Sequence, residues 1–416
     1  MRGDAVGRIS DARANVVHAH LPGAAVGELV EIHRRRGTAT IHGTVRKIND
    51  GTARIAPHGE IEGVCRGDEV RVLSTGFLAP VGLHALGRAI DARGRVIDGG
   101  DDMTARRKTI AFLRPSPAQR VIPTAPLWTG IKTVDALLTI ARGGRVGIFG
   151  VAGSGKSSLL AAMERGSVVD ASVVALIGER GREAREWLAR LHPRMTIVCA
   201  SSDRSAAERV AAATMAIAQA NQLRELGLDV LLILDSLARL AAAIREVAVA
   251  CGEPVGRGGF PASVCAELAR FVEAAGATSV GSITLAATVL SDENSDRDTV
   301  AEIARSLLDG HITLSLAHVH AGRYPAIDVS LSASRLMHGV IERDHANDAA
   351  IVRRAICALK DSMDARSLGL PQANPQVRAA QRCEAEIEEF QRQEVEPVPA
   401  ARTLRDLHAL AERLLL

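Results

Sequence analysis

The stretch Arg145-Val146-Gly147-Ile148-Phe149-Gly150-Val151-Ala152-Gly153-Ser154-Gly155-Lys156-Ser157 decides the fold of this 416-residue chain. It starts as an apolar, strand-like run, passes into the pattern G-x-x-x-x-G-K-S over residues 150–157, and leads into the helix-forming run Ser158–Glu164. Glycines in such a loop let backbone N–H groups surround a phosphate, and the helix that follows directs the positive end of its dipole toward it. The whole chain contains only five lysines, which argues against a chance match at Lys156.

We therefore predict that this loop binds the phosphates of ATP. Lys156 would contact the β- and γ-phosphates, and the Ser157 hydroxyl would ligate Mg²⁺. The alternative is a glycine-rich turn between a strand and a helix that binds nothing. The expected ATP-binding residues of the loop are Gly150, Val151, Ala152, Gly153, Ser154, Gly155, Lys156, Ser157 and Ser158.

Composition limits the class of protein. A hydrophobic content of 47% in 416 residues supports a full-sized core in two or three domains, which excludes a disordered or fibrous protein. The 51 basic and 48 acidic residues nearly balance, so overall charge does not indicate nucleic-acid binding. Six scattered cysteines form no CxxC or CxxH pair, which argues against a zinc site or a disulfide framework. We see no signal-like or membrane-spanning apolar run and expect a soluble, cytoplasmic protein.

The N-terminal part of the chain has a β-like pattern. Short apolar runs broken by glycine predict a small β-barrel or sandwich over residues 1–98. Four prolines between Leu113 and Pro126 would interrupt a helix or a central strand, so residues 99–126 are predicted to be a linker. The expected strands of the barrel are Val16–Ala19, Leu29–Ile32, Thr38–Val45, Ala53–Ile55 and Glu69–Leu73.

After the linker, strand-like runs alternate with longer amphipathic stretches over residues 127–345. This alternation is typical of a parallel sheet covered by helices on both faces. Helical periodicity over Ala379–Arg392 and Thr403–Leu416 predicts a helical domain over residues 346–416. The predicted fold class is therefore α/β, with a central P-loop domain between a small barrel and a helical domain. The expected central strands are Arg145–Phe149, Val173–Ile177, Met195–Val198, Val230–Leu234 and Ser282–Val289.

Two acidic residues follow apolar strands of this central region. Asp235 ends the run Val230–Leu234, and ligands bind at the carboxyl ends of strands in open α/β sheets. We predict that Asp235 holds Mg²⁺; the alternative is a helix N-cap. Glu179 is the first acid beyond Ala171–Ile177 and could act as a base or position water. The alternative for Glu179 is the solvated start of a helix.

Further segments share the pattern of one protein family. They are Thr129–Asp135, Gly178–Glu183, Asp235–Arg239, Gly252–Pro254, Gly258–Val264, Leu308–Ile312, Tyr324–Asp328 and Ser334-Arg335. Together they resemble type III secretion ATPases, relatives of the flagellar export ATPase and of the catalytic subunit of F-type ATP synthases. The N-terminal segments Gly7–Ile9, Leu21–Val30 and Gly94–Asp98 resemble the family's barrel and the segment leading out of it. The resemblance extends over residues 6–345 and implies a RecA-like central domain.

The resemblance implies roles for individual residues. Glu179 would be the carboxylate that polarises the attacking water, and Arg335 an arginine finger delivered into the neighbouring subunit's site. Tyr324 would stack on adenine, while Arg180 and Arg239 would lie near the phosphates. Taken alone, Arg335 would be a surface or salt-bridging arginine, and Tyr324 a core residue. The expected catalytic set is Lys156, Glu179, Arg180 and Arg335.

An arginine that acts on a neighbour requires a ring. The resemblance therefore implies a homohexamer with sites between subunits and a channel lined partly by Gly256–Ser263. The implied partners are a central coiled-coil stalk, peripheral stator and regulator proteins, chaperone–effector complexes and the inner-membrane export gate, with no nucleic acid. The implied location is cytoplasmic and peripheral, at the inner-membrane face of the secretion apparatus.

The function predicted is that of an ATP-hydrolysing motor that couples turnover to chaperone release, unfolding and export of secreted proteins. Alternatives are a flagellar export ATPase, a non-hydrolysing nucleotide-binding ring subunit, and a nucleic-acid motor of the hexameric helicase type. Retention of Lys156, Glu179, Asp235 and Arg335 argues against the silent subunit. Near-neutral charge and an aromatic content of 2% argue against the helicase.

The C-terminal region departs from the family pattern. The segment Asp364–Gly369 lacks the usual aromatic residues, and only Glu388–Phe390 and Gln393 match sparsely. In the family this region binds chaperones and exported substrates, so the resemblance leaves the specificity of this chain open.

Overall fold

A computed structural model describes residues 5–13, 15–35, 40–103, 108–110, 114–291, 298–363, 368 and 374–415. The chain forms two compact units, each made of two separate stretches of sequence. Unit 1 comprises Met1–Ser116 and Ala171–Ala274, and unit 2 comprises Pro117–Asp170 and Ala275–Leu416. The P-loop motif therefore belongs to unit 2, whereas Glu179 and Asp235 belong to unit 1.

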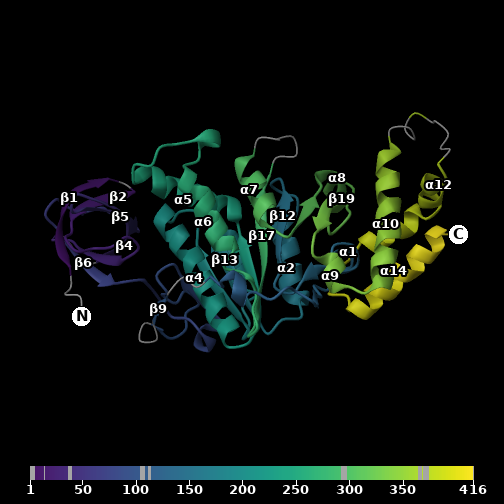
Figure 1. Ribbon diagram of the computed structural model, residues 1–416, viewed down its shortest axis with the longest axis horizontal. Coiled ribbons are helices and arrows are strands. Elements are labelled where there is room, and N and C mark those ends of the chain that lie inside the picture. The colour runs from purple at the N-terminus through teal and green to yellow at the C-terminus, as the bar shows by residue number, and fades with distance from the viewer. Residues whose placement is uncertain are drawn as a thin grey trace. The chain divides into compact units, whose positions relative to one another are not determined.

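Unit 1 begins with a closed six-stranded barrel, which confirms the barrel and removes the sandwich alternative (Figure 1). Alternate side chains point inward, and Val17, Val30, Ile32, Val45 and Ile55 are completely buried in its core. The barrel order is β1-β2-β5-β4-β3-β6. The strands are β1 (Val6–Arg13), β2 (Val16–His20), β3 (Leu29–His33), β4 (Ile41–Asn49), β5 (Thr52–His58) and β6 (Glu69–Ser74).

Five barrel strands match the predicted ones. β1 was not predicted, because its run of alternating charged and small residues lacks a continuous apolar pattern. The start of the predicted strand Thr38–Val45 lies outside the described residues, and β4 begins at Ile41.

The second part of unit 1 is a parallel sheet with the order β15-β13-β14-β8. β13 (Ala171–Ile177) is buried at all seven positions, which explains its continuous apolar sequence. Its neighbours are β14 (Met195–Ala200), β15 (Asp229–Asp235) and β8 (Arg88–Asp91). β8 lies within the segment predicted as barrel, residues 1–98, yet it pairs with β14 in this sheet.

Helices of unit 1 pack on this sheet and on one another. α4 (Ala206–Glu225) contacts β13, β14 and β15, α5 (Leu237–Ala250) packs beside α4, and α6 (Ala262–Val272) packs beside α5. α4 starts with a capping box in which Ser205 accepts from the Glu208 N–H and Glu208 reaches back to the Ser205 N–H. The remaining elements of unit 1 are β7 (Phe77–Ala79), η1 (Leu83–Ala85), β9 (Lys108–Ile110), α3 (Gly181–Leu188) and η4 (Arg257–Gly259).

Unit 2 carries four strands in the order β19-β18-β12-β17. β12 (Arg145–Gly150) is parallel to β17 (Ser282–Leu290) and to β18 (Gly310–Leu314), whereas β19 (Ile327–Ser334) is antiparallel to β18. The helices beside these strands are α1 (Lys132–Leu137), α2 (Lys156–Gly166), α7 (Thr299–Leu307), α8 (Leu316–His320) and α9 (Met337–Val340). Short elements are η3 (Pro117–Gln119), β10 (Pro126–Leu127), β11 (Ile140–Ala141) and β16 (Gly276–Ala277).

The chain ends in a helical part, as predicted. The helices are α10 (Arg343–Asp361), α12 (Pro375–Arg382), α13 (Glu384–Gln391) and α14 (Ala400–Leu415) (Figure 1). The predicted single helix over Ala379–Arg392 is two helices that meet at Cys383. The divergent segment Asp364–Gly369 lies outside the described residues except for residue 368.

All six cysteines are free thiols. Among the helices that the structure describes, none combines the length and apolar character that crossing a bilayer requires.

Candidate active site

The phosphate-binding motif lies in a loop between β12 and α2. Gly153 and Gly155 have φ values of 82° and 94°, in the left-handed region that glycine adopts without a steric penalty. Gly155 is the N-cap of α2, and residues 152 and 153 are exposed. Ser154 is 1% exposed, and its hydroxyl donates to the Val151 carbonyl at 2.9 Å. The loop thus has the strand–loop–helix context that the sequence predicts for a phosphate cradle.

Lys156 is directed back over this loop. Its ammonium group donates to the Gly150 carbonyl at 2.7 Å and to the Val151 carbonyl at 2.6 Å. Ser157, the next residue, is exposed at the start of α2. The side chain of Lys156 is therefore held over the loop, where an ammonium group attracts the β- and γ-phosphates of a nucleotide.

A second turn of unit 2 supports α2 at its other end. Gly130 lies so close to Gly166, the last residue of α2, that a Cβ on Gly130 would be 3.2 Å from the Gly166 Cα. The buried carboxylate of Asp135 holds this turn. It accepts from the Thr129 N–H at 2.8 Å, the Thr129 hydroxyl at 2.7 Å and the Gly130 N–H at 2.9 Å. Asp135 lies in the segment Thr129–Asp135 that resembles the family, but no role was predicted for it.

We predict that Asp135→Asn destabilises the protein by about 1–3 kcal/mol, because the amide places a donor against backbone N–H groups that lose their acceptor. Burial raises the pKa of Asp135 to about 7. Below that pH the folded state binds a proton that the unfolded chain has released, so the stability contributed by Asp135 falls as pH rises toward 7. Thermal unfolding should therefore show a smaller cost of Asp135→Asn above pH 7 than below it.

The control for this prediction is Asp361→Asn, which alters an exposed aspartate on α10. The thermal midpoint of that variant should follow the wild type at both pH values. A cost of Asp135→Asn that grows with pH would contradict the burial argument.

Unit 1 holds the two predicted carboxylates at one edge of its parallel sheet. Leu176 of β13 pairs with Asp235 of β15, and Glu179 follows the end of β13 after Gly178. Glu179 is 5% exposed and Asp235 is 4% exposed, so neither is a solvated surface acid. Each acid therefore lies at or just beyond the carboxyl end of its strand, where the sequence analysis expects it.

Burial and neighbouring residues shift the pKa of Glu179. Burial is the main cause that raises the pKa of Glu179 to about 8, with further contributions from a hydrogen bond to Glu183 and from the charge of Asp235. Arg239 opposes the rise: its guanidinium lies 2.5 Å from the Glu179 carboxylate and also donates to the Gly178 carbonyl at 2.7 Å. The hydrogen bond to Glu179 lowers the pKa of Glu183. A buried carboxyl with a raised pKa is suited to accept a proton or to orient water near neutral pH.

The local backbone explains how these side chains are placed. Ser236, not Asp235, caps α5, because its hydroxyl accepts from the Arg239 N–H at 3.3 Å. Arg180 is the N-cap residue of α3 and is exposed. Glu183 lies in the segment Gly178–Glu183 that resembles the family, but no role was predicted for it. Glu183 is four residues after Glu179, across the start of α3, and this spacing indicates that the two side chains lie close together.

Each unit contains an oxygen donor of the kind that magnesium takes in nucleotide sites. The described residues contain no cluster of three or more His, Cys, Asp or Glu side chains that could hold a metal ion by themselves. Magnesium in nucleotide sites takes one or two protein oxygens and completes its shell with phosphates and water. The Ser157 hydroxyl and the Asp235 carboxylate are oxygen donors of this kind.

Within unit 2, Tyr324 and the P-loop lie at the same edge of the strands. β19 begins at Ile327, which pairs with Leu314 at the carboxyl end of β18, and β18 is parallel to β12. Tyr324 precedes this start by three residues and is 51% exposed, which rules out a core tyrosine. Its ring is therefore available for a planar ligand on the phosphate-loop side of the strands.

Arg335 lies at the opposite edge. It follows Ser334, the last residue of β19, which pairs with Gly310, and Gly310 is level with Val146 at the start of β12. Val146 and Phe149 are separated by about 10 Å along the strand, so Arg335 is at least that far from the P-loop of its own chain. Arg335 is exposed, and its guanidinium donates to the Arg305 carbonyl at 3.2 Å.

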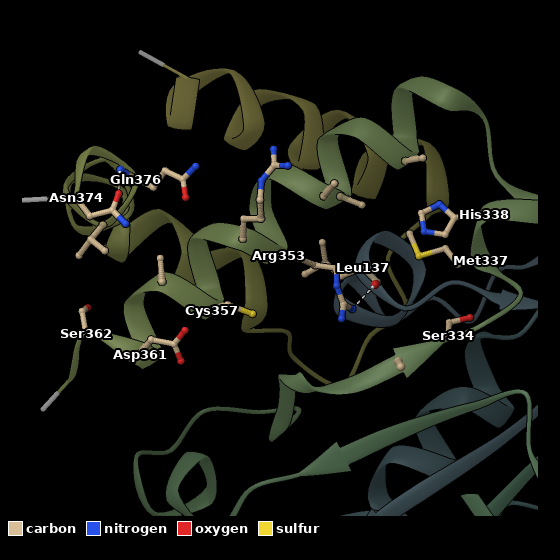
Figure 2. A pocket seen from close by; sticks show the side chains of 17 residues that line it. Leu137, Ser334, Met337, His338, Arg353, Cys357, Asp361, Ser362, Asn374 and Gln376 are labelled. Carbon is tan, nitrogen blue, oxygen red and sulfur yellow. Dashed lines mark hydrogen bonds between the residues drawn. The ribbon is translucent and has the colours of Figure 1, made fainter. Parts of the chain in front are cut away.

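The segment that carries Arg335 is firmly anchored. The Ser334 hydroxyl donates to the Thr139 carbonyl at 2.7 Å, and the Arg335 N–H donates to the Asp309 carbonyl at 2.9 Å. Beside it lies a cavity of about 760 Å³ formed by β19, α9, α10 and α12. Figure 2 shows Arg353 of α10 extending within this cavity toward the Leu137 carbonyl, to which it donates at 2.9 Å. The second donor of Arg353 bonds the Ser332 carbonyl at 2.9 Å, which ties α10 to β19.

Comparison with known proteins places these features in one family. Residues 130–334 match the nucleotide-binding domain of the ATP synthase alpha/beta family. The chain is 40% identical to the "Type 3 secretion system ATPase" of Pseudomonas savastanoi pv. phaseolicola, over 98% of this chain and 94% of that protein. It is 36% identical to the "Flagellum-specific ATP synthase" of Treponema pallidum, over 92% of this chain and 88% of that protein.

Solved structures agree with this similarity. The assembled ATPase EscN from the type III secretion system of enteropathogenic E. coli has a TM-score of 0.91 to this chain at 33% identity, covering 97% of this chain and 100% of EscN. EscN in complex with its central stalk EscO has a TM-score of 0.88 with the same coverage.

Proposed function

Because the chain belongs to the family of type 3 secretion system ATPases, we propose that it is the ATP-hydrolysing motor of a type III protein secretion apparatus. The chain is an ATPase. In this role, turnover of ATP drives chaperone release, unfolding and export of secreted proteins. The observation that carries the proposal is the buried Glu179 beside Asp235, since a ring subunit that only binds nucleotide has no need of a buried carboxylate at this edge of the sheet.

The nucleotide is bound as Mg·ATP. The loop residues 150–158 hold the phosphates through their N–H groups, and Lys156 provides the positive charge for the β- and γ-phosphates. Ser157 and Asp235 would hold Mg²⁺, which neutralises phosphate charge when it is bound. Tyr324 stacks on the adenine ring, a role that its exposed face and its place at the P-loop edge support.

Hydrolysis requires an oriented water molecule. Glu179 polarises the water that attacks the γ-phosphate, and Arg239 fixes the carboxylate of Glu179 through its 2.5 Å ion pair. Arg180, exposed at the start of α3, contributes positive charge near the phosphates.

Arg335 completes the site of a neighbouring subunit. Its place at the edge opposite to its own P-loop supports action in trans and therefore a homohexameric ring with a site at each subunit boundary. Assembly of the relative EscN supports the same arrangement. Such a ring has a central channel, partly lined by Gly256–Ser263.

We infer the partners of this chain from its family. A central coiled-coil stalk would bind the ring; the relative EscN is solved in complex with its central stalk EscO. Peripheral stator and regulator proteins, chaperone–effector complexes and the inner-membrane export gate complete the proposed set. The chain would act in the cytoplasm, peripherally at the inner-membrane face of the apparatus.

Gene deletion tests the proposed function. In the organism that carries this gene, deletion should abolish export of the proteins that the apparatus secretes, and the wild-type gene should restore it. Lys156→Ala, expressed at the same level, should not restore export, because the phosphates lose their positive partner. Lys108→Ala, which changes an exposed lysine, is the matched control and should restore export fully.

The flagellar alternative has a separate outcome in this experiment. Loss of motility with intact export of non-flagellar proteins would overturn the proposed role and assign the chain to flagellar export. Export that is restored by Lys156→Ala would overturn the role of ATP hydrolysis in the process.

A further inference from the structure

One residue of the C-terminal region bonds to the Tyr324 segment and to the turn at residues 129–132, which we call the Gly130 turn and which contacts the last residue of α2. Gln393 lies in the extended segment 392–399 between α13 and α14, which we call the C-terminal strap. Its backbone N–H donates to the Tyr324 carbonyl at 2.9 Å. Both polar atoms of its side chain form hydrogen bonds with the Gly130 turn. The Gln393 Nε2 donates to the Gly130 carbonyl at 2.7 Å, and the Gln393 Oε1 accepts from the Lys132 N–H at 2.8 Å.

The Gly130 turn contacts α2, the helix that follows the phosphate loop. A Cβ at Gly166, the last residue of α2, would be 2.2 Å from the Thr129 carbonyl oxygen, so the two backbones are in direct contact. On its other side the turn meets the strap, because the Val398 N–H donates to the Gly130 carbonyl at 2.9 Å. α2 begins at the phosphate loop and ends at this turn. A continuous set of contacts therefore runs from the phosphate loop through α2 and the Gly130 turn to Gln393 and Tyr324.

The strap is held near Gln393 by further contacts. The Lys132 ammonium lies 5.7 Å from the centre of the Phe390 ring and donates to the Glu389 carbonyl at 3.3 Å. The Gln393 side chain also donates to the Glu396 carbonyl at 3.0 Å, which fixes the bend of the strap. Tyr324 itself is half exposed. The neighbouring Arg323 donates from its N–H to the His318 carbonyl at 2.9 Å and pairs with Glu388. Together with these contacts, the bond from Gln393 to the Tyr324 carbonyl fixes the segment that carries the ring.

We propose that Gln393 is a positioning residue for nucleotide selectivity: it holds the Tyr324 loop at a fixed distance from the P-loop helix, so that adenine and triphosphate are bound together. This inference rests on the proposed role of Tyr324 in adenine stacking. Gln393 contacts neither the phosphates nor the base in this scheme; it acts through Tyr324. The expected signature is a loss of affinity for ATP that spares a ligand made of phosphates alone.

The test compares ATP with inorganic tripolyphosphate, which has the phosphates and no base. In the full-length protein, Gln393→Ala should weaken ATP binding and raise the KM for ATP about tenfold, the effect of losing one base stack, with kcat changed by less than about twofold. Competition by tripolyphosphate should be unchanged. Gln393→Met, which keeps the length of the side chain and removes its hydrogen bonds, should give the same result if Gln393→Ala folds poorly.

Two further variants make the test specific. Gln376→Ala alters an exposed glutamine on α12 of the same helical region, and it should leave the preference for ATP over tripolyphosphate unchanged. Tyr324→Ala should lose the preference, and adding Gln393→Ala to it should have no further effect, because both act on the same contact.

The outcomes distinguish the role of Gln393 from the proposed contact between Tyr324 and adenine. Equal weakening of ATP and tripolyphosphate by Gln393→Ala, or no weakening of either, overturns the role of Gln393. If Tyr324→Ala leaves the preference for ATP intact, the proposed adenine contact itself is overturned. If Tyr324→Ala removes the preference and both Gln393 variants retain it, only the inference about Gln393 fails.

Discussion

Glu179→Gln is expected to lower kcat for ATP hydrolysis by roughly 10²- to 10⁴-fold while ATP still binds. The amide has the shape of the carboxyl but cannot take a proton or polarise water as a carboxylate does. The residues expected to hold the phosphates, 150–158, belong to unit 2 and are not altered by this change in unit 1. Turnover should be measured by phosphate release under saturating Mg·ATP, and binding by titration with a fluorescent ATP analogue.

The matched control for this prediction is Glu186→Gln. Glu186 lies on α3, the helix that follows Glu179, and makes an exposed ion pair with Arg182 at 3.4 Å, so the same chemical change is made at a nearby exposed glutamate. Surface pairs of this kind contribute little, and turnover should stay within about twofold of the wild type. Equal rates for Glu179→Gln and the wild type would refute the proposed mechanism and favour another residue as the partner of water.

The buried strands of the sheets could be predicted from sequence because burial on both faces leaves a continuous apolar run. β13 and β17 show this pattern most clearly, and both were predicted. β19 was missed because four of its eight residues are partly or fully exposed and it contains Ser330, Ser332 and Ser334. β8 has only four residues, and nothing in so short a run indicates that it joins β14, more than a hundred residues later in the chain.

The site residues also differ in how far they could be predicted from sequence. The phosphate loop is local, so residues 150–157 could be identified from spacing alone. Contacts between distant segments could not: Arg239 reaches the Gly178 carbonyl across 61 residues, and Gln393 reaches Gly130 across 263 residues. Sequence reasoning could place Arg239 near the phosphates only through the family resemblance. It gave no indication that Arg239 pairs with Glu179.

Arg335→Ala should reduce kcat by about 10³-fold or more, the range measured when an arginine that stabilises the transferring phosphoryl group is removed. The variant should still assemble, because Arg335 is exposed and its neighbours Ser334 and Asp309 keep the end of β19 in place. Arg354→Ala removes an exposed arginine of α10 and serves as the control. Oligomeric state should be measured by light scattering together with turnover.

The geometry of β19 makes a sharper prediction about where Arg335 acts. Its own P-loop lies at the other edge of the strands, so a lone protomer should be nearly inactive and turnover per subunit should rise with protein concentration. Mixing Arg335→Ala with Glu179→Gln should restore activity, because a Glu179→Gln subunit can supply its intact Arg335 to the intact site of an Arg335→Ala neighbour. Each variant alone should remain inactive. Turnover that is independent of concentration, together with no recovery on mixing, would place Arg335 outside the catalytic reaction.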